Sequence, residues 1–136
     1  MKRCLLFISA VSICLSVFSQ QQKVISPAGR KVNELLAKMT LEEKVGQMTQ
    51  ITLGVLNPKT DGKLDAAALK NAVINYKVGS ILNAPDHALT VAQWNALLTE
   101  IANEANHTRL KIPVLYGLDA IHGQTYTSDA VLFPWT

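Results

Sequence analysis

The chain has 136 residues, of which 49% are hydrophobic and 17% are charged, and its formal net charge is +3. This composition excludes a collagen-like protein, a disulfide scaffold and a disordered chain, and the length suits one compact soluble domain. The charge alone indicates a basic protein, but two of the cations lie at the extreme N-terminus.

The N-terminus has the pattern of a secretory signal peptide. Lys2 and Arg3 precede the apolar run Cys4–Phe18, and we expect cleavage near Ser19. A membrane anchor is the alternative, but the run has only 15 residues, whereas a helix that spans a bilayer needs about 20. We therefore expect residues 1–19 to be a signal peptide. Residues 20–136 would be exported to the periplasm or the extracellular space, without a stable membrane anchor.

Cleavage would also change the chemistry of the chain. Lys2 and Arg3 leave without any acidic residue, so most of the net charge is lost and no cluster of cations remains for nucleic acid. Cys4 and Cys14 leave as well, which excludes a disulfide, a structural zinc site with cysteine ligands and a catalytic thiol in the exported chain. We expect no nucleic-acid partner, and the oligomeric state is open.

An arm and two helices are the first elements predicted after the signal. The polar residues Gln20–Gly29 are predicted to form a leader arm. Thr40 and Glu43 have the spacing of a capping box, which predicts that a short helix begins there. The helix before it is predicted from apolar residues at i, i+3, i+4 and i+7, which would form one buried stripe: Val32, Leu35, Leu36 and Met39.

A strand, a loop and a helix are predicted next. The β-favouring run Met48–Leu53 predicts the strand, and the polar run Asn57–Lys63 predicts a loop rich in turns. Asp65 is placed to cap a helix that extends to about Tyr76. One face of this helix carries Ala66, Leu69, Val73 and Tyr76.

The alternation continues to the end of the chain. Ser80–Asn83 is predicted to form a short buried strand, and Thr90 is predicted to cap the longest helix. Ile112–Asp119 is predicted to be an apolar strand that ends on a carboxylate. The apolar stripe of the long helix places Trp94 in the core rather than on a sugar-stacking surface, together with Val91, Leu97, Leu98, Ile101 and Ala105.

The order strand, helix, strand, helix, strand is typical of βαβ units with parallel strands, and it predicts an α/β fold. Two architectures use such units, the doubly wound sheet and the (β/α)₈ barrel of the TIM type. A dinucleotide-binding sheet needs a glycine-rich turn after its first strand, but Gly54 is the only glycine there. Polar residues at the carboxyl ends of the strands favour the barrel, because barrel active sites are built at those ends.

The candidate binding residues are Asp119 and His122. Asp119 follows a predicted buried strand, and His122 lies three residues later, so both side chains can face one pocket. Gly117 and Gly123 allow a ligand or a neighbouring backbone to approach closely. Such a pair can form hydrogen bonds with sugar hydroxyls. The alternative is structural, with Asp119 as the cap of the following turn and His122 as a packed histidine.

Three segments carry a family resemblance: Leu35–Met48, Ile112–Gly123 and Leu132–Pro134. In order and spacing they resemble the N-terminal part of a family 3 glycoside hydrolase of the β-glucosidase type. The hexosaminidase branch of that family carries Glu-Gly-Gly where this chain has Ala-Ile-His-Gly after Asp119, so that branch is disfavoured.

The resemblance implies that residues 20–136 are an incomplete, N-terminal portion of a (β/α)₈ barrel. It implies a retaining hydrolase of terminal, non-reducing β-D-glucosyl residues, with β-linked glucosides or oligosaccharides as its partners. The family's nucleophilic aspartate and acid/base glutamate come from later regions, so no catalytic residue is expected in this chain, and the chain alone is expected to be inactive. Asp119 matches the family's sugar-binding aspartate. No metal or other cofactor is implied, because the reaction uses carboxylates and water.

Two alternatives stay open at this stage. The parent enzyme could be of the β-xylosidase type, or the chain could be a small secreted carbohydrate-binding or scaffold protein without catalysis. Asp129, in the final loop, is a weaker candidate to face the pocket. His87 and His107 show no spacing typical of metal ligands and are expected to be ordinary loop and helix-end residues.

Overall fold

The computed structural model describes residues 26–120 and 123–131. The chain divides into two units, residues 1–37 and residues 38–136. The predicted signal peptide, His122 and the segment Leu132–Pro134 lie outside the described residues.

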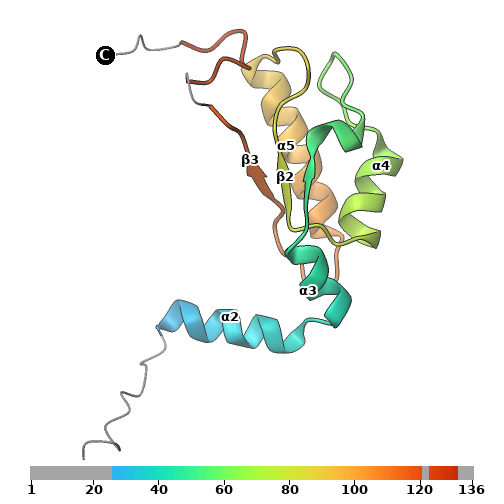
Figure 1. Ribbon diagram of the computed structural model, residues 1–136, viewed down its shortest axis with the longest axis vertical. Coiled ribbons are helices and arrows are strands. Elements are labelled where there is room, and N and C mark those ends of the chain that lie inside the picture. Colours follow the sequence, from blue (N-terminus) through green and yellow to red (C-terminus); the bar gives the residue numbers. More distant parts are fainter. Residues whose placement is uncertain (1–25, 121–122, 132–136) are drawn as a thin grey trace, which may run out of the picture. The chain divides into compact units, whose positions relative to one another are not determined.

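The first unit is described through one helix, α2 (Pro27–Lys38), which is blue in Figure 1. The Ser26 hydroxyl accepts a hydrogen bond from the amide of Gly29 at 3.1 Å, and a proline at the first helical position loses no intrahelical hydrogen bond. The predicted leader arm is therefore wrong from Pro27 onward. The predicted stripe is confirmed only in part: Met39 is buried and Leu35 is half-buried, whereas Val32 and Leu36 are exposed.

The second unit begins with the short helix α3 (Leu41–Gln47). The predicted capping box is confirmed: the Thr40 hydroxyl accepts from the amide of Glu43 at 3.3 Å, and the Glu43 carboxylate accepts from the amide of Thr40 at 2.8 Å. Glu43 also binds Arg109, which anchors α3 to the segment before the last strand.

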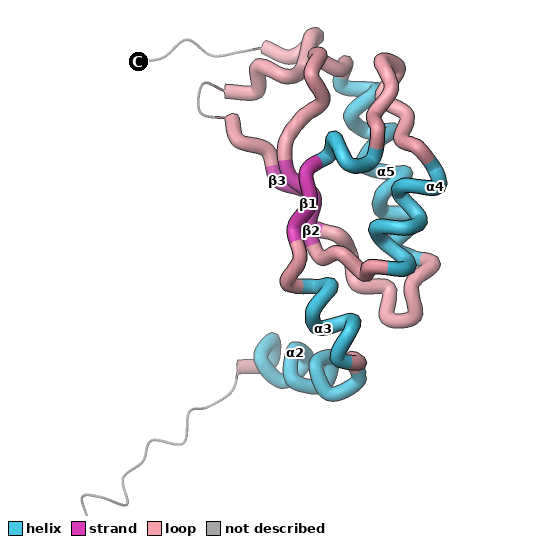
Figure 2. Tube along the Cα trace, turned by 45° about the vertical axis from the view of Figure 1, so that its right-hand side comes forward, coloured by secondary structure: helices cyan, strands magenta, loops and turns pink. Residues whose placement is uncertain are grey.

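Three short parallel strands form the sheet, in the order β1 (Gln50–Thr52), β2 (Ser80–Leu82) and β3 (Leu115–Gly117). Ile51, Ile81 and Tyr116 are in register across them. The predicted α/β class with parallel strands is therefore confirmed. Figures 1 and 2 show the three strands side by side, with helices on one side of them.

The helices between the strands differ in regularity. The 3₁₀ helix η1 (Leu53–Leu56) directly follows β1. The helix α4 (Ala66–Lys70) is capped by Asp65, whose carboxylate accepts from the amide of Ala68 at 2.8 Å, and it continues as the π-helical segment η2 (Asn71–Asn75). The long helix α5 (Val91–Asn106) has a second capping box, formed by Thr90 and Gln93.

Two details of the predicted helices are wrong. Tyr76 is 68% exposed, because the wider π-helical turn bonds its amide to the carbonyl of Asn71 and rotates it off the buried face. Val91 and Leu98 of the α5 stripe are also exposed, since the stripe is wider than the surface that the described residues cover.

The predicted strand Ile112–Asp119 is wrong at both ends, because only Leu115–Gly117 pairs with β2. Lys111 has a left-handed backbone with φ of 53°, and Pro113 has no amide to donate to a ladder. Asp119 consequently lies two residues beyond the strand, in the loop that follows it.

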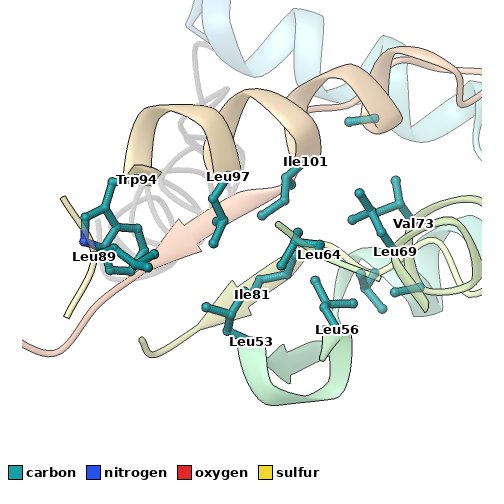
Figure 3. Close-up of a cluster of buried hydrophobic side chains, with 13 residues drawn as sticks. Leu53, Leu56, Leu64, Leu69, Val73, Ile81, Leu89, Trp94, Leu97 and Ile101 are labelled. Carbon is teal, nitrogen blue, oxygen red and sulfur yellow. The ribbon is translucent and has the colours of Figure 1, made fainter. Parts of the chain in front are cut away.

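The core lies between the sheet and the helices α4 and α5, as Figure 3 shows. Leu53, Leu56, Ile81 and Leu97 are fully buried, and Trp94 is 7% exposed, which confirms its predicted core position. The remaining buried members of the cluster are Leu64, Leu69, Ala72, Val73, Val78, Leu89, Ile101 and Ala105.

Candidate functional site

The carboxyl ends of β2 and β3 are tied together by the residues that follow them. Asn83, directly after β2, has a left-handed backbone with φ of 76°. Its amide donates to the carbonyl of Gly117 at 3.0 Å, and its carbonyl accepts from the Tyr116 hydroxyl. Burial raises the pKa of Tyr116 from its ordinary value of 10 to about 12, so this phenol stays protonated as a donor even in mildly alkaline solution.

Asp119 lies at this edge of the sheet, two residues after Gly117. The residue is exposed, and its carboxylate forms no hydrogen bond or ion pair with the other described residues. It is therefore accessible to a ligand from solvent. Its predicted partner, His122, lies outside the described residues, so the pair stays a prediction.

The loop that follows Asp119 returns to the beginning of α5. The carbonyl of Tyr126 accepts from the amide of Leu89 at 3.0 Å and from the indole Nε1 of Trp94 at 3.1 Å. The carboxylate of Asp129 accepts from the amide of Val91 at 2.7 Å. Asp129 was predicted as a weak candidate to face a pocket, but the structure gives its carboxylate this contact with the helix.

The loop between β2 and α5 holds a second polar pair. The Nδ1 atom of His87 lies 2.8 Å from Oδ1 of Asp86, and this hydrogen bond lowers the pKa of Asp86. The Nε2 atom of His87 is buried without a hydrogen-bond partner in the described part of the chain. Sequence reasoning missed this pair, and two adjacent polar residues in a loop offered no periodicity that would have marked them.

A cavity of about 470 Å³ lies at the opposite end of the sheet, where residues that precede the strands line it. The ion pair between Glu43 and Arg109 borders it, with Oε2 and Nη2 at 2.6 Å. The hydrogen bond from Arg109 and then the backbone amide of Thr40 lower the pKa of Glu43. This cavity is separate from the edge that carries Asp119.

No other ligand-holding cluster stands out in the part of the chain that the structure describes. Over residues 26–120 and 123–131, no three His, Cys, Asp or Glu side chains are grouped so that they could hold a metal ion. Among the same residues, none of the helices has the length and apolar character needed to cross a membrane. Asp119 is an exposed acid that follows β3 at the carboxyl edge of the sheet.

Comparison with known proteins gives consistent matches. Residues 40–136 match the model of the family described as "Glycosyl hydrolase family 3 N terminal domain". The chain is 32% identical over 112 residues to "Lysosomal beta glucosidase" of Dictyostelium discoideum, a match that covers 76% of this chain and 14% of that protein. It is 32% identical over 93 residues to "Periplasmic beta-glucosidase" of Salmonella typhimurium, which covers 68% and 10%. The chain therefore spans a small part of the length of both relatives.

Proposed function

Because the chain belongs to glycosyl hydrolase family 3, in its N-terminal domain, we propose that it forms the first three strands of a (β/α)₈ barrel that binds β-linked glucosides. The parallel order β1, β2, β3 and the placement of α4 and α5 on one side of the sheet support this proposal. In such a barrel the carboxyl ends of the strands line the active site, and Asp119 lies at that edge.

The observation that carries the proposal is the exposed Asp119 carboxylate, which makes no contact that would occupy it among the described residues. A carboxylate accepts hydrogen bonds from two neighbouring sugar hydroxyls, and bonds to a charged acceptor are stronger than neutral ones. We propose that the Asp119 carboxylate binds the terminal, non-reducing glucosyl residue. On the sequence alone, His122 is its proposed partner.

Hydrolysis with retention needs two carboxyl groups about 5–5.5 Å apart, one as nucleophile and one as acid/base. We propose that both come from regions outside residues 20–136, so that this chain binds the sugar without cleaving its bond. The matched part is only 14% and 10% of the lengths of the two relatives, which supports the proposal that sugar binding and bond cleavage use different regions of the whole protein. The reaction class of a retaining β-glucosidase is thus proposed for the whole barrel domain.

Export is part of the proposal. Residues 1–19 have the charge and apolar pattern of a signal peptide, and the two relatives are named as lysosomal and periplasmic enzymes. Both compartments lie outside the cytosol. N-terminal sequencing of the secreted chain should find Gln20 or a close neighbour as the first residue, and an intact Met1 would contradict this assignment.

Binding and turnover test the function separately. The purified chain is titrated with methyl β-D-glucopyranoside and incubated with 4-nitrophenyl β-D-glucopyranoside, with the xylosides in parallel. We expect binding without turnover and a preference for the glucoside. Asp119→Ala should weaken binding about tenfold or more, because a hydrogen bond to a charged group contributes about 1.5–3 kcal/mol. Asp61→Ala, which changes another exposed acid, is the matched control.

Each part of the proposal has its own contrary result. Turnover at the rate of a full-length enzyme would show that the chain holds the catalytic groups. Unchanged affinity in Asp119→Ala would remove Asp119 from the site. Tighter binding of the xyloside would favour a β-xylosidase parent.

A small carbohydrate-binding or scaffold protein is the second candidate, and the buried core favours it. Thirteen buried side chains form one cluster within the second unit. Large apolar side chains are also exposed there, for example Leu115 at 72% and Met48 at 79%, which favours the barrel proposal. A cooperative thermal transition of a monomeric chain would support the second candidate, whereas aggregation on heating without such a transition would support the first.

A further inference from the structure

The amino end of α5 is held by two side chains from different parts of the chain. Thr90 and Gln93 form the local capping box, in which the Thr90 hydroxyl accepts from the amide of Gln93 at 3.1 Å. The amide of Val91, the first residue of the helix, donates instead to Oδ1 of Asp129 at 2.7 Å, across 38 positions of sequence. A carboxylate is favoured at this end, because the helix dipole is positive there.

The contact of Asp129 is the last of a series that joins its loop to the start of α5. Leu89, which is fully buried, donates its amide to the carbonyl of Tyr126 and accepts from the amide of Ser128, both at 3.0 Å. These two bonds enclose Thr127, which forms a parallel bridge with Leu89 and is 8% exposed. The loop is therefore held by its backbone as well as by the carboxylate.

Asp119 lies between this anchor and the end of β3. On one side, the carbonyl of Gly117 is held by the amide of Asn83. On the other side, the amide of Gly123 donates to the carbonyl of Ala120 at 3.0 Å, next to Asp119. Neither of these bonds involves α5, whereas the loop of residues 123–131 is bonded to the start of α5.

We propose that Asp129 is a positioning residue: by attaching the loop of residues 123–131 to the N-terminus of α5, it orders the segment that presents Asp119. The effect of Asp129 on sugar binding rests on the function proposed above for Asp119. The effect of Asp129 on the order of the loop does not rest on that function, because it is measured on the backbone amides alone.

A helix cap without a positioning role is the competing explanation, and Thr90→Ala is the matched control for it. Thr90→Ala removes the local cap of α5 but leaves every bond between the loop and the helix in place. If Asp129 acted only as a cap, both variants would loosen the first turn of α5 and nothing else. A positioning role requires that Asp129→Ala also loosens the segment next to Asp119.

Amide hydrogen exchange and glucoside titration of the whole chain test the proposal. In Asp129→Ala we expect the amides of Gly123 and Ser128 to exchange about tenfold faster, and the Kd for methyl β-D-glucopyranoside to rise about tenfold, because one charge-assisted hydrogen bond is lost. Asp129→Asn keeps an oxygen acceptor at the same place and should stay within about threefold of the wild type in both measurements. Thr90→Ala should leave the Gly123 amide and the Kd unchanged.

The outcomes separate the two proposals. Unchanged exchange at Gly123 in Asp129→Ala, or equal effects of Asp129→Ala and Thr90→Ala, would overturn the positioning role. Faster exchange with an unchanged Kd would support the ordering of the loop and overturn its consequence for sugar binding. Faster exchange in a chain whose wild type binds no glucoside would support the role of Asp129 in ordering the loop and refute the function assigned to Asp119.

Discussion

Gly79 is the position at which the fold depends most directly on the absence of a side chain. It precedes β2, and a Cβ atom added there would lie 2.1 Å from the carbonyl oxygen of Gln47 and 2.7 Å from its carbonyl carbon. The amide of Gly79 donates to the carbonyls of Gly46 at 2.8 Å and Thr49 at 3.2 Å. Gly79→Ala therefore forces two backbone segments apart, because the atoms in the way are not those of a flexible side chain.

The expected cost follows from these contacts. Each lost hydrogen bond costs about 1 kcal/mol, and crowding of a packed site adds about 1–3 kcal/mol. The free energy of unfolding should thus fall by about 3–5 kcal/mol, out of the about 5–15 kcal/mol that is typical of a small domain.

Equilibrium unfolding in urea, followed by tryptophan fluorescence, measures this cost. Gly54→Ala is the matched control, because the nearest atom to its added Cβ is Oγ1 of Thr52 at 3.9 Å, and it should stay within about 0.5 kcal/mol of the wild type. If the two variants unfold at the same urea concentration, the close approach of Gly79 to Gln47 does not contribute to stability, and the expected cost of about 3–5 kcal/mol is refuted.

Three further predictions concern the core and two titrating groups. Leu97→Ala should lower the free energy of unfolding by about 2–5 kcal/mol in urea, because the side chain is fully buried, whereas the 38% exposed Leu98 should tolerate the same change at a much smaller cost. The raised pKa of Tyr116 means that the folded state holds a proton that the unfolded state loses; stability should therefore fall between about pH 10 and 12, and Tyr116→Phe should remove this fall in alkaline unfolding curves. The lowered pKa of Glu43 has the opposite sign, so its contribution is present above the ordinary value of 4.5 and lost as the pH falls below it. Acid unfolding of Glu43→Gln should show a weaker pH dependence than that of the wild type. Identical curves would show that the contact between Glu43 and Arg109 does not stabilise the fold.

Local sequence signals predicted the elements whose physical causes are themselves local. The capping residues Thr40, Asp65 and Thr90 each lie within three positions of the amide that they accept from, so spacing alone identifies them. The short apolar runs between helices likewise predicted three strands, and parallel pairing follows from the helices that connect them.

What sequence could not predict depends on partners that are distant in the chain. Arg109 binds Glu43 across 66 positions, and Asp129 binds Val91 across 38, and neither spacing follows a helical or strand period. The π-helical segment is a further case, because the residues around Asn71 have the composition of an ordinary helix. For the candidate site, Asp119 was predicted from its place after an apolar strand, but the attachment of its loop to α5 required the fold.

The proposed barrel assigns different roles to the two ends of the sheet, and this division connects the predictions above. The amino end holds the close approach of Gly79 to Gln47 and the pair of Glu43 with Arg109, all of which are contacts within the chain. At the carboxyl end, Asp119 makes no such contact with the other described residues, and hydrogen bonds join the surrounding loops. In barrel enzymes the amino face serves stability and the carboxyl face serves binding and chemistry. Substitutions at the first end should therefore change unfolding but leave the glucoside affinity of the folded chain intact, whereas Asp119→Ala should change affinity with little effect on unfolding, because an exposed carboxylate without a contact contributes little to stability.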